Sequence, residues 1–396
     1  MEQLDLLDVP PLYCHPTRLT VKRDRPHQSN TMGSIDVFTL TDGGQSADDV
    51  ARRVAGFLHP AKATLELALY DVRLPDPTGS IVADELKAAS ARGVTTRLLY
   101  NVDSGRPSEI HPPPRTRPEI LAELPIEARP VPGIPDLMHH KYAIRDGGAV
   151  LAGSANWTID SWTRQENVLA IIESPEIAGR FRQNFEELWA RPEVDQSGRI
   201  DPEPVDVGGV QVTAWFTPGH GEQLSQRIST AIGASRSRVR IASPVITSGP
   251  ILGTLAELAD KGGRDIAGVV DGPQTDIVFQ QWAENGHTAW KIPLLAATLS
   301  KLPFAAKPST PWTPDSELHD FMHAKVTVAD DVVFLGSFNL SRSGEQNAES
   351  VLEIHDGALA DRLAKFVDDV RGRYPAADIP TQSLPITPST PSARSA

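Results

Sequence analysis

The pattern of apolar and polar positions divides the chain into two halves that repeat one order of elements. Each half contains an apolar run typical of a strand, then an amphipathic segment ending at a glycine, then a second strand-like run. A further helix is predicted at the end of each half. The predicted elements are strands at 65–72 and 94–103 around a helix at 80–93, strands at 237–246 and 264–272 around a helix at 249–263, and closing helices at about 175–190 and 357–373.

Strand, helix and strand at this spacing are typical of right-handed βαβ units, in which the two strands are parallel. We therefore predict an α/β fold of two α/β/α domains related by pseudo-twofold symmetry, each with a mixed, mainly parallel sheet. Stretches rich in proline, glycine and polar residues set the boundaries. The expected parts are an irregular segment at 1–35, a first domain at 36–190, a linker at 191–209, a second domain at 210–374 and a disordered tail at 375–396.

A motif of six residue types occurs once in each half. The first copy has the order H-x-K-x4-D-x6-G-S-x-N, and the second copy has H-x-K-x4-D-x5-G-S-x-N. Two copies at matching places make an accidental match untenable, and they favour related domains over two unrelated α/β domains. The shared positions are His139, Lys141, Asp146, Gly153, Ser154 and Asn156 in the first copy, and His323, Lys325, Asp330, Gly336, Ser337 and Asn339 in the second.

These residue types suit chemistry on a phosphodiester. A histidine and a lysine two positions apart on a strand point to the same face, so each copy presents an imidazole beside a positive charge. Lysine ammonium groups neutralise the phosphate, and hydroxyl and amide groups add hydrogen-bond donors. If two such sets face each other, one imidazole attacks phosphorus and the other protonates the leaving oxygen. The scheme requires no metal ion and no cofactor.

A glutamate follows each motif at nearly the same distance from its histidine. Glu166 lies in SWTRQENVLAII and Glu349 in SRSGEQNAESVLEI, and each enters an apolar, strand-like segment. A carboxylate at that place could bind the far nitrogen of a catalytic imidazole and set its tautomer. We therefore expect both glutamates to support the two histidines.

The repeated motif resembles that of the phospholipase D superfamily over residues 36–374. The resemblance implies two phospholipase D-like domains and a reaction through a phosphohistidine. It implies that His139 and His323 are nucleophile and acid, with His139 the nucleophile because the first motif usually supplies it in two-motif phospholipases. It further implies phosphate binding by Lys141, Lys325, Asn156 and Asn339, with Ser154 and Ser337 nearby, support from Glu166 and Glu349, and a structural role for Asp146 and Asp330 set back from the phosphate.

Composition helps to choose between substrates. The net charge of −13 argues against nonspecific binding of nucleic acid, because neutralisation of phosphates by basic residues supplies most of that affinity. We favour cleavage or transfer of phospholipid head groups. A nuclease or nucleotide phosphodiesterase is the first alternative, and the segments GSANWT and QENV favour it. A catalytically silent binding protein is the second alternative.

The cellular setting is also constrained. The single cysteine, Cys14, cannot form an intrachain disulfide, and no basic start followed by an apolar run marks a signal peptide. We expect a cytoplasmic monomer and leave peripheral membrane contact open.

Several further residues have a functional and a structural interpretation. His140 alternates with His139 along a strand, so we expect it to be structural or exposed. His319 and His323 have a spacing that occurs in metal sites, but the repeat already explains His323, and we expect no metal. Aromatic and basic residues near the motifs could line the substrate entrance or be buried or solvated; they are Trp157, Trp162, Trp312, Arg106, Arg115 and Arg117.

Overall fold

The structure is a computed structural model that describes residues 33–74, 76–102, 116, 123–133, 135–310 and 319–378. The first half confirms the predicted strands and helices to within a few residues. A serine caps α1 by accepting a hydrogen bond from the backbone of the first turn, as helix N-termini require. The elements of this half are β1 (Ser34–Leu40), α1 (Ala47–Leu58), β2 (Thr64–Leu69), β3 (Val72–Arg73), α2 (Thr78–Ala91), β4 (Thr95–Val102), β5 (Glu127–Pro132), β6 (Lys141–Arg145), β7 (Ala149–Gly153), β8 (Trp157–Thr158), α4 (Ile159–Thr163), β9 (Gln165–Glu173) and α5 (Pro175–Ala190).

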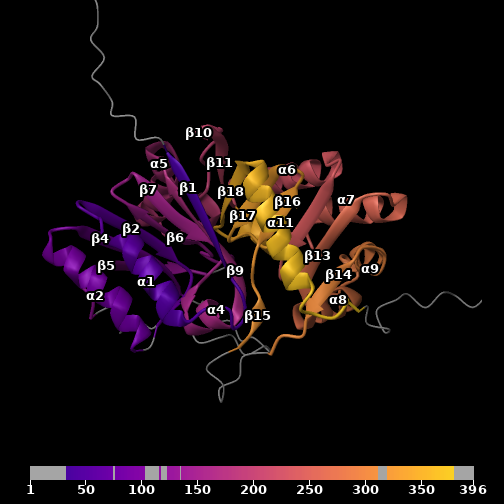
Figure 1. Cartoon of the computed structure of the whole chain (residues 1–396), viewed down its shortest axis with the longest axis horizontal. Coiled ribbons are helices and arrows are strands. Elements are labelled where there is room, and N and C mark those ends of the chain that lie inside the picture. The colour runs from indigo at the N-terminus through magenta and orange to yellow at the C-terminus, as the bar shows by residue number, and fades with distance from the viewer. Residues whose placement is uncertain are drawn as a thin grey trace, which may run out of the picture. The chain divides into compact units, whose positions relative to one another are not determined.

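The second half repeats this order with extra helices before its last parallel strand (Figure 1). Its elements are η1 (Val194–Gln196), β10 (Val205–Val207), β11 (Val210–Phe216), α6 (Gly221–Ala234), β12 (Arg238–Ala242), α7 (Gly249–Lys261), β13 (Asp265–Asp271), α8 (Gly272–Glu284), η2 (Ala289–Lys291), α9 (Ile292–Lys301), β14 (Phe304–Lys307), β15 (Phe321–Met322), β16 (Val326–Ala329), β17 (Val332–Gly336), α10 (Arg342–Gln346), β18 (Ser350–His355) and α11 (Gly357–Arg371).

The strand orders of the two main sheets make the repeat explicit. The first sheet runs β1-β9-β7-β6-β2-β4-β5, and the second runs β11-β18-β17-β16-β12-β13-β14, with β10 added at its edge. Each strand of one order corresponds to the strand in the same place of the other. The predicted mixed α/β fold with pseudo-twofold symmetry is confirmed.

The balance of strand directions differs from the prediction. The predicted βαβ units are present, because β2, β4 and β5 are mutually parallel, as are β12, β13 and β14. The other neighbours along the two strand orders pair antiparallel. These are the strands of β1-β9-β7-β6-β2 in the first sheet and of β10-β11-β18-β17-β16-β12 in the second. The excess of antiparallel pairs arises because the motif itself forms a hairpin, β6–β7 or β16–β17, with a tight turn that needs no helical crossover.

Helices cover both faces of the sheets and bury three apolar clusters. One cluster lies between the first sheet and helices α1 and α2, and a second lies beside α6, α7 and α9 in the other half. The third contains side chains of both halves, including Phe181 of α5, Phe216 of β11 and the methionine that precedes each motif histidine. Burial of this shared cluster holds the two halves together, since removing apolar surface from water is the main driving force of packing.

The expected boundaries shift slightly. The expected linker at 191–209 contains η1 and β10, which pairs with β11, and the first half begins with β1 at Ser34. The expected tail starts with paired residues, because Ala376 bridges Ala305 in β14 and the carbonyl of Pro375 accepts a hydrogen bond from Ala306. Residues 379–396 lie outside the described part. Within that described part, no helix has the length and apolar character needed to cross a membrane.

Candidate active site between the two halves

Both motif histidines line one cavity of about 120 Å³ at the junction of the two halves. His139 lies just before β6, and His323 lies between β15 and β16. The junction is closed by backbone pairing, since β15 adds to the first sheet beside β9 and Met138 forms a bridge with Ala348. The remaining residues of the cavity wall are Tyr70, Asp71, Arg73, Asn156, Asp160, Gln165, His319 and Phe321.

His139 is held by a carboxylate from the other half. Its Nδ1 atom lies 2.8 and 2.9 Å from the two carboxylate oxygens of Glu349, whose side chain is fully buried. The backbone N–H of Glu349 donates to Thr217 Oγ1, and Asn347 donates to its Oε1 atom. The carboxylate fixes the ring orientation and favours the tautomer that carries its proton on Nδ1, which leaves Nε2 for chemistry.

His323 is held by an amide and not by a carboxylate. Its Nδ1 atom lies 3.0 Å from Oδ1 of Asn167, which also accepts a hydrogen bond from Ser154. The amide nitrogen of Asn167 donates to the carbonyl of Ser161, which fixes which end of the amide faces the ring. The two histidines therefore have chemically different partners, although the motifs that contain them are nearly identical.

The expectation that Glu166 supports a motif histidine is wrong. Glu166 is fully buried, and its carboxylate accepts hydrogen bonds from Lys307 Nζ at 3.0 Å and from the hydroxyl of Tyr374 at 2.5 Å. Asn167, the next residue along β9, reaches His323 in its place. Adjacent residues of a strand face opposite sides, so only one of the two can approach the ring.

A one-residue offset between the two half-to-half pairings explains the exchange. Met322 pairs with Glu166, whereas Met138 pairs with Ala348, which corresponds to Gln165 in the repeat. In both cases the residue that follows the paired one reaches the histidine. After Glu166 this residue is Asn167, and after Ala348 it is Glu349. A slip of one residue exchanges the faces of a strand, so the offset decides which side chain becomes the partner.

The two motif lysines are buried, each two residues after a histidine of the cavity wall. Lys141 and Lys325 donate to the backbone carbonyls of His139 and His323 at 2.7 and 2.6 Å. Burial lowers the pKa of Lys141 to about 7 and moves the pKa of Lys325 well below its ordinary range, where the charge of Lys141 adds to the effect of burial. Binding of an anion beside them, such as a phosphodiester, favours the charged form of both lysines.

Burial also lowers the pKa of both histidines. The pKa of His139 falls to about 4, although the carboxylate of Glu349 opposes the shift. The pKa of His323 falls well below its ordinary value, through burial and then through the charges of Lys325 and Lys141. Both rings are thus neutral in the free protein near pH 7. The charge of a bound phosphodiester opposes that of the lysines and favours protonation of one ring.

The asparagines and serines of the motif have different places. Asn156 lines the cavity, and within the described part of the chain the buried Oδ1 atoms of Asn156 and Asn339 have no hydrogen-bond partner. The two serines were expected near the phosphate, but neither lines the cavity. Ser154 Oγ accepts from the backbone N–H of Val168 at 2.9 Å, and Ser337 Oγ accepts from that of Ser350 at 3.0 Å. Each serine joins the motif to the next strand of its sheet.

The motif aspartates support the turns that follow β6 and β16. Asp146 and Asp330 both have a φ of 52°, in the left-handed region that non-glycine residues rarely adopt. The carboxylate of each accepts three consecutive backbone N–H groups, from 62–64 for Asp146 and from 236–238 for Asp330. These bonds lower the pKa of both carboxyls. The aspartates therefore fasten the hairpin to the neighbouring strand.

The other histidines of interest have partners or packing of their own. His319 lies in the cavity wall, where its Nδ1 atom is 2.8 Å from a carboxylate oxygen of Asp160. His140 is fully buried and packs against the rings of Tyr142 and Phe216. Among the residues that the structure describes, no group of three or more His, Cys, Asp or Glu side chains is placed to hold a metal ion.

We predict that activity persists in EDTA, because the two lysines supply the positive charge that a metal ion supplies in other phosphodiesterases. Turnover is measured before and after dialysis against the chelator, and again after addition of Mg²⁺, Mn²⁺, Ca²⁺ or Zn²⁺. Loss of activity in EDTA with recovery in one of these ions would contradict the prediction and return attention to His319.

Other expectations have mixed outcomes. Trp157 and Trp162 are buried, and neither lines the cavity that contains His139 and His323. Trp312 and the arginines at 106, 115 and 117 lie outside the described residues. The sequence interpretation missed Asn167, Tyr70 and Lys307. Only Asn167 carried a local signal, as a polar residue next to Glu166 at the start of a strand that is apolar from Val168 to Ile172.

The site and the duplicated sheets define a phospholipase D-type protein with one composite site. A family model described as "Cardiolipin synthase, PLD-like domain" matches residues 55–189 and 228–370. The chain belongs to this family. The two matched segments contain one motif each, so the family match follows the repeat found in the sequence.

Relatives and solved structures agree with this assignment. The chain is 30% identical over 145 residues to a mitochondrial cardiolipin hydrolase of Xenopus tropicalis and 28% identical over 175 residues to that of Homo sapiens. These matches cover 36% and 41% of this chain, and 62% and 63% of the relatives' lengths. The phosphatidylserine synthase of Haemophilus influenzae Rd KW20 superposes with a TM-score of 0.57 at 14% identity, covering 86% of this chain and 85% of the synthase. The last comparison supports the fold alone.

Proposed function

We propose that this protein is a phosphodiesterase that cleaves or transfers phospholipid head groups through a phosphohistidine intermediate. The observation that carries the proposal is the pair of histidines, one from each half, on the wall of a single cavity, each followed two residues later by a buried lysine. An imidazole pair with two lysines nearby is suited to displacement at an anionic phosphorus centre, because a bound phosphodiester favours the charged form of the lysines and these then stabilise the charge that develops.

The reaction has two steps in this proposal. Nε2 of His139 attacks phosphorus, a P–N bond forms, and the P–O bond to the leaving group breaks while His323 gives its proton to the departing oxygen. Water or an alcohol then gives a proton to His323 and attacks phosphorus, and the P–N bond breaks to restore His139. With water the net result is hydrolysis, and with an alcohol it is transfer of the phosphatidyl group.

The unequal partners of the histidines support this division of roles. Glu349 can stabilise the positive charge that develops on His139 when its Nε2 atom becomes bonded to phosphorus. Asn167 offers His323 a neutral partner, so the imidazolium of His323 gives up its proton more readily. A carboxylate favours the attacking ring, and an amide favours the proton donor.

The phospholipid substrate is inferred from the relatives named as cardiolipin hydrolases and from the net charge of −13. The test compares cardiolipin-containing vesicles with a single-stranded oligonucleotide at equal phosphodiester concentration. Release of phosphatidic acid without cleavage of the oligonucleotide supports the proposal. Cleavage of the oligonucleotide alone would assign the same site to nucleic acid. The variant with both histidines replaced controls for contaminating activity.

We predict that the covalent intermediate forms on His139. A phosphodiester with a nitrophenolate leaving group needs little protonation, so His323→Ala should still release nitrophenol in a single turnover and retain phosphate on His139. His139→Ala should release none. Peptide mapping of the acid-labile phosphate identifies the residue. Finding the label on His323 would reverse the assignment and leave the two-histidine mechanism intact.

We further propose that the protein acts as a monomer, because each half of one chain contributes a histidine to the same cavity.

A further inference from the structure

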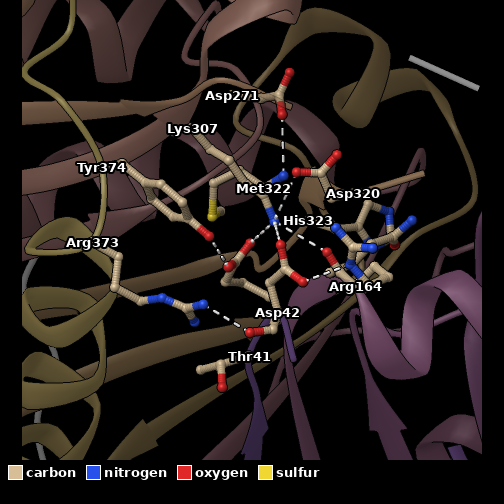
Figure 2. Close-up of polar contacts among 12 residues, drawn as sticks. Thr41, Asp42, Arg164, Asp271, Lys307, Asp320, Met322, His323, Arg373 and Tyr374 are labelled. Carbon is tan, nitrogen blue, oxygen red and sulfur yellow. Dashed lines mark hydrogen bonds and ion pairs between the residues drawn. The ribbon is translucent and has the colours of Figure 1, made fainter. Parts of the chain in front are cut away.

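A buried cluster around Lys307 includes Glu166, the residue of β9 that precedes the partner of His323, Asn167. Lys307 is 1% exposed, and its Nζ atom lies 3.0 Å from a carboxylate oxygen of Glu166 and 3.2 Å from one of Asp42 (Figure 2). Tyr374 donates to the second oxygen of Glu166. The cluster joins the halves, because Asp42 and Glu166 belong to the first and Lys307 and Tyr374 to the second.

The residues that follow α11 complete the cluster from outside. Arg373 donates to the backbone carbonyl of Asp42 at 2.7 Å, and the phenol of Tyr374 reaches inward to the buried carboxylate (Figure 2). Ala376 then pairs with Ala305 of β14, the strand that contributes Lys307. Backbone pairing thus holds Tyr374 beside the lysine.

The other half offers an internal comparison, because it has no such lysine. In β13–β14, Asp271 pairs with Lys307, and the carboxylate of Asp271 accepts a bond from the backbone N–H before the catalytic histidine. In β4–β5, Asn101 pairs with Val131, and its amide oxygen accepts the corresponding bond. Val131 therefore occupies the position of Lys307. Glu349 lies in the junction where Val131 takes the place of the lysine, and its carboxylate binds His139.

We propose that Lys307 is a positioning residue which, with Tyr374, binds the carboxylate of Glu166 on the face of β9 opposite Asn167, and so stabilises the register that leaves Asn167 as the partner of His323. This inference rests on the proposed function, since it explains how two nearly identical motifs acquire different roles. The repeat contains a glutamate for each histidine. The register turns Glu166 away from the ring of His323, and Lys307 compensates the charge of the carboxylate that is turned away. One histidine is left with a carboxylate partner and the other with an amide.

The proposal predicts opposite pH shifts for two single variants. Lys307→Met leaves the negative charge of Glu166 uncompensated near His323, which favours the imidazolium and raises the pKa of His323. Glu166→Gln leaves the positive charge of Lys307 and lowers that pKa. The alkaline limb of kcat/KM, where the proton donor is lost, should move up by about half a pH unit or more in the first variant and down in the second.

The charged or titratable groups that also face His323 must be held constant for the comparison; they are Lys325, Lys141, His139 and His319. All four remain in both variants. The double variant Lys307→Met/Glu166→Gln removes both charges, so its alkaline limb should return to within about 0.2 pH unit of the unmodified protein. A role confined to stability would lower the melting temperature and leave the limb in place.

Two further variants keep the test decisive. Tyr374→Phe removes one hydroxyl from a half-buried ring, and it should move the limb upward by less than Lys307→Met does, even if the latter fails to fold. Lys301→Met, which removes an exposed lysine paired with Asp260, is the matched control and should change nothing.

NMR titration of histidine-labelled protein, with the His323 signal assigned from His323→Ala, reads the pKa without turnover. Unmoved His323 titrations in Lys307→Met, Glu166→Gln and Tyr374→Phe would overturn this inference. Absence of phosphodiesterase activity in the unmodified protein would instead overturn the proposed function.

Discussion

Replacing either His139 or His323 with alanine should lower turnover of an unactivated phosphodiester by at least about 10³-fold, and replacing both should be little worse than replacing one. Each histidine performs a step that the other cannot perform, because both line one cavity and their Nδ1 atoms are bound by different partners. Residues that act as one unit give strongly non-additive losses, since the second deletion removes a function that is already lost.

The measurement is steady-state turnover of the three variants on the best natural substrate found, with folding checked by thermal unfolding. His287→Ala is a suitable control, because His287 is exposed and outside the cavity. Half of the original activity in each single variant would mean two independent sites. That outcome would remove the composite-site model, whatever the substrate.

Replacing Glu349 with glutamine should lower kcat by about 10² to 10⁴-fold with a smaller effect on KM. The glutamine keeps the size of the side chain and an amide oxygen that can accept from Nδ1, but it loses the negative charge that stabilises the imidazolium of His139. Binding of the phosphodiester depends mainly on the lysines, which the substitution leaves in place. The loss therefore falls on the chemical step.

Single-turnover formation of the phosphohistidine separates an effect on the chemical step from an effect on substrate binding. It should slow in Glu349→Gln and stay near the original rate in Glu257→Gln, which alters an exposed glutamate of α7. Equal rates in the two variants would show that the carboxylate only packs beside His139. Nucleophile and acid would then have to be assigned without reference to their partners.

The elements of the fold were accessible from sequence because their signals are local. The helix at 249–263 and the strand at 264–272 correspond to α7 and β13 within a residue or two, since apolar periodicity and glycine stops act within one element. The motif hairpins were not foreseen. Their turns depend on an aspartate in the left-handed region whose carboxylate binds backbone from a distant strand. A single apolar run does not reveal that partner, and so the antiparallel excess was missed.

The sequence by itself determined the duplicated fold and the paired histidines and lysines, because these residues lie at fixed short spacings within each copy. Only the tertiary structure decided what holds each histidine. His139 and Glu349 are 210 positions apart, and His323 and Asn167 are 156 apart. Which residue reaches the ring depends on the register between strands of different halves, where an offset of one residue replaces a glutamate by an asparagine. Spacing along the chain carries no information about that register, because it is set by packing across the junction.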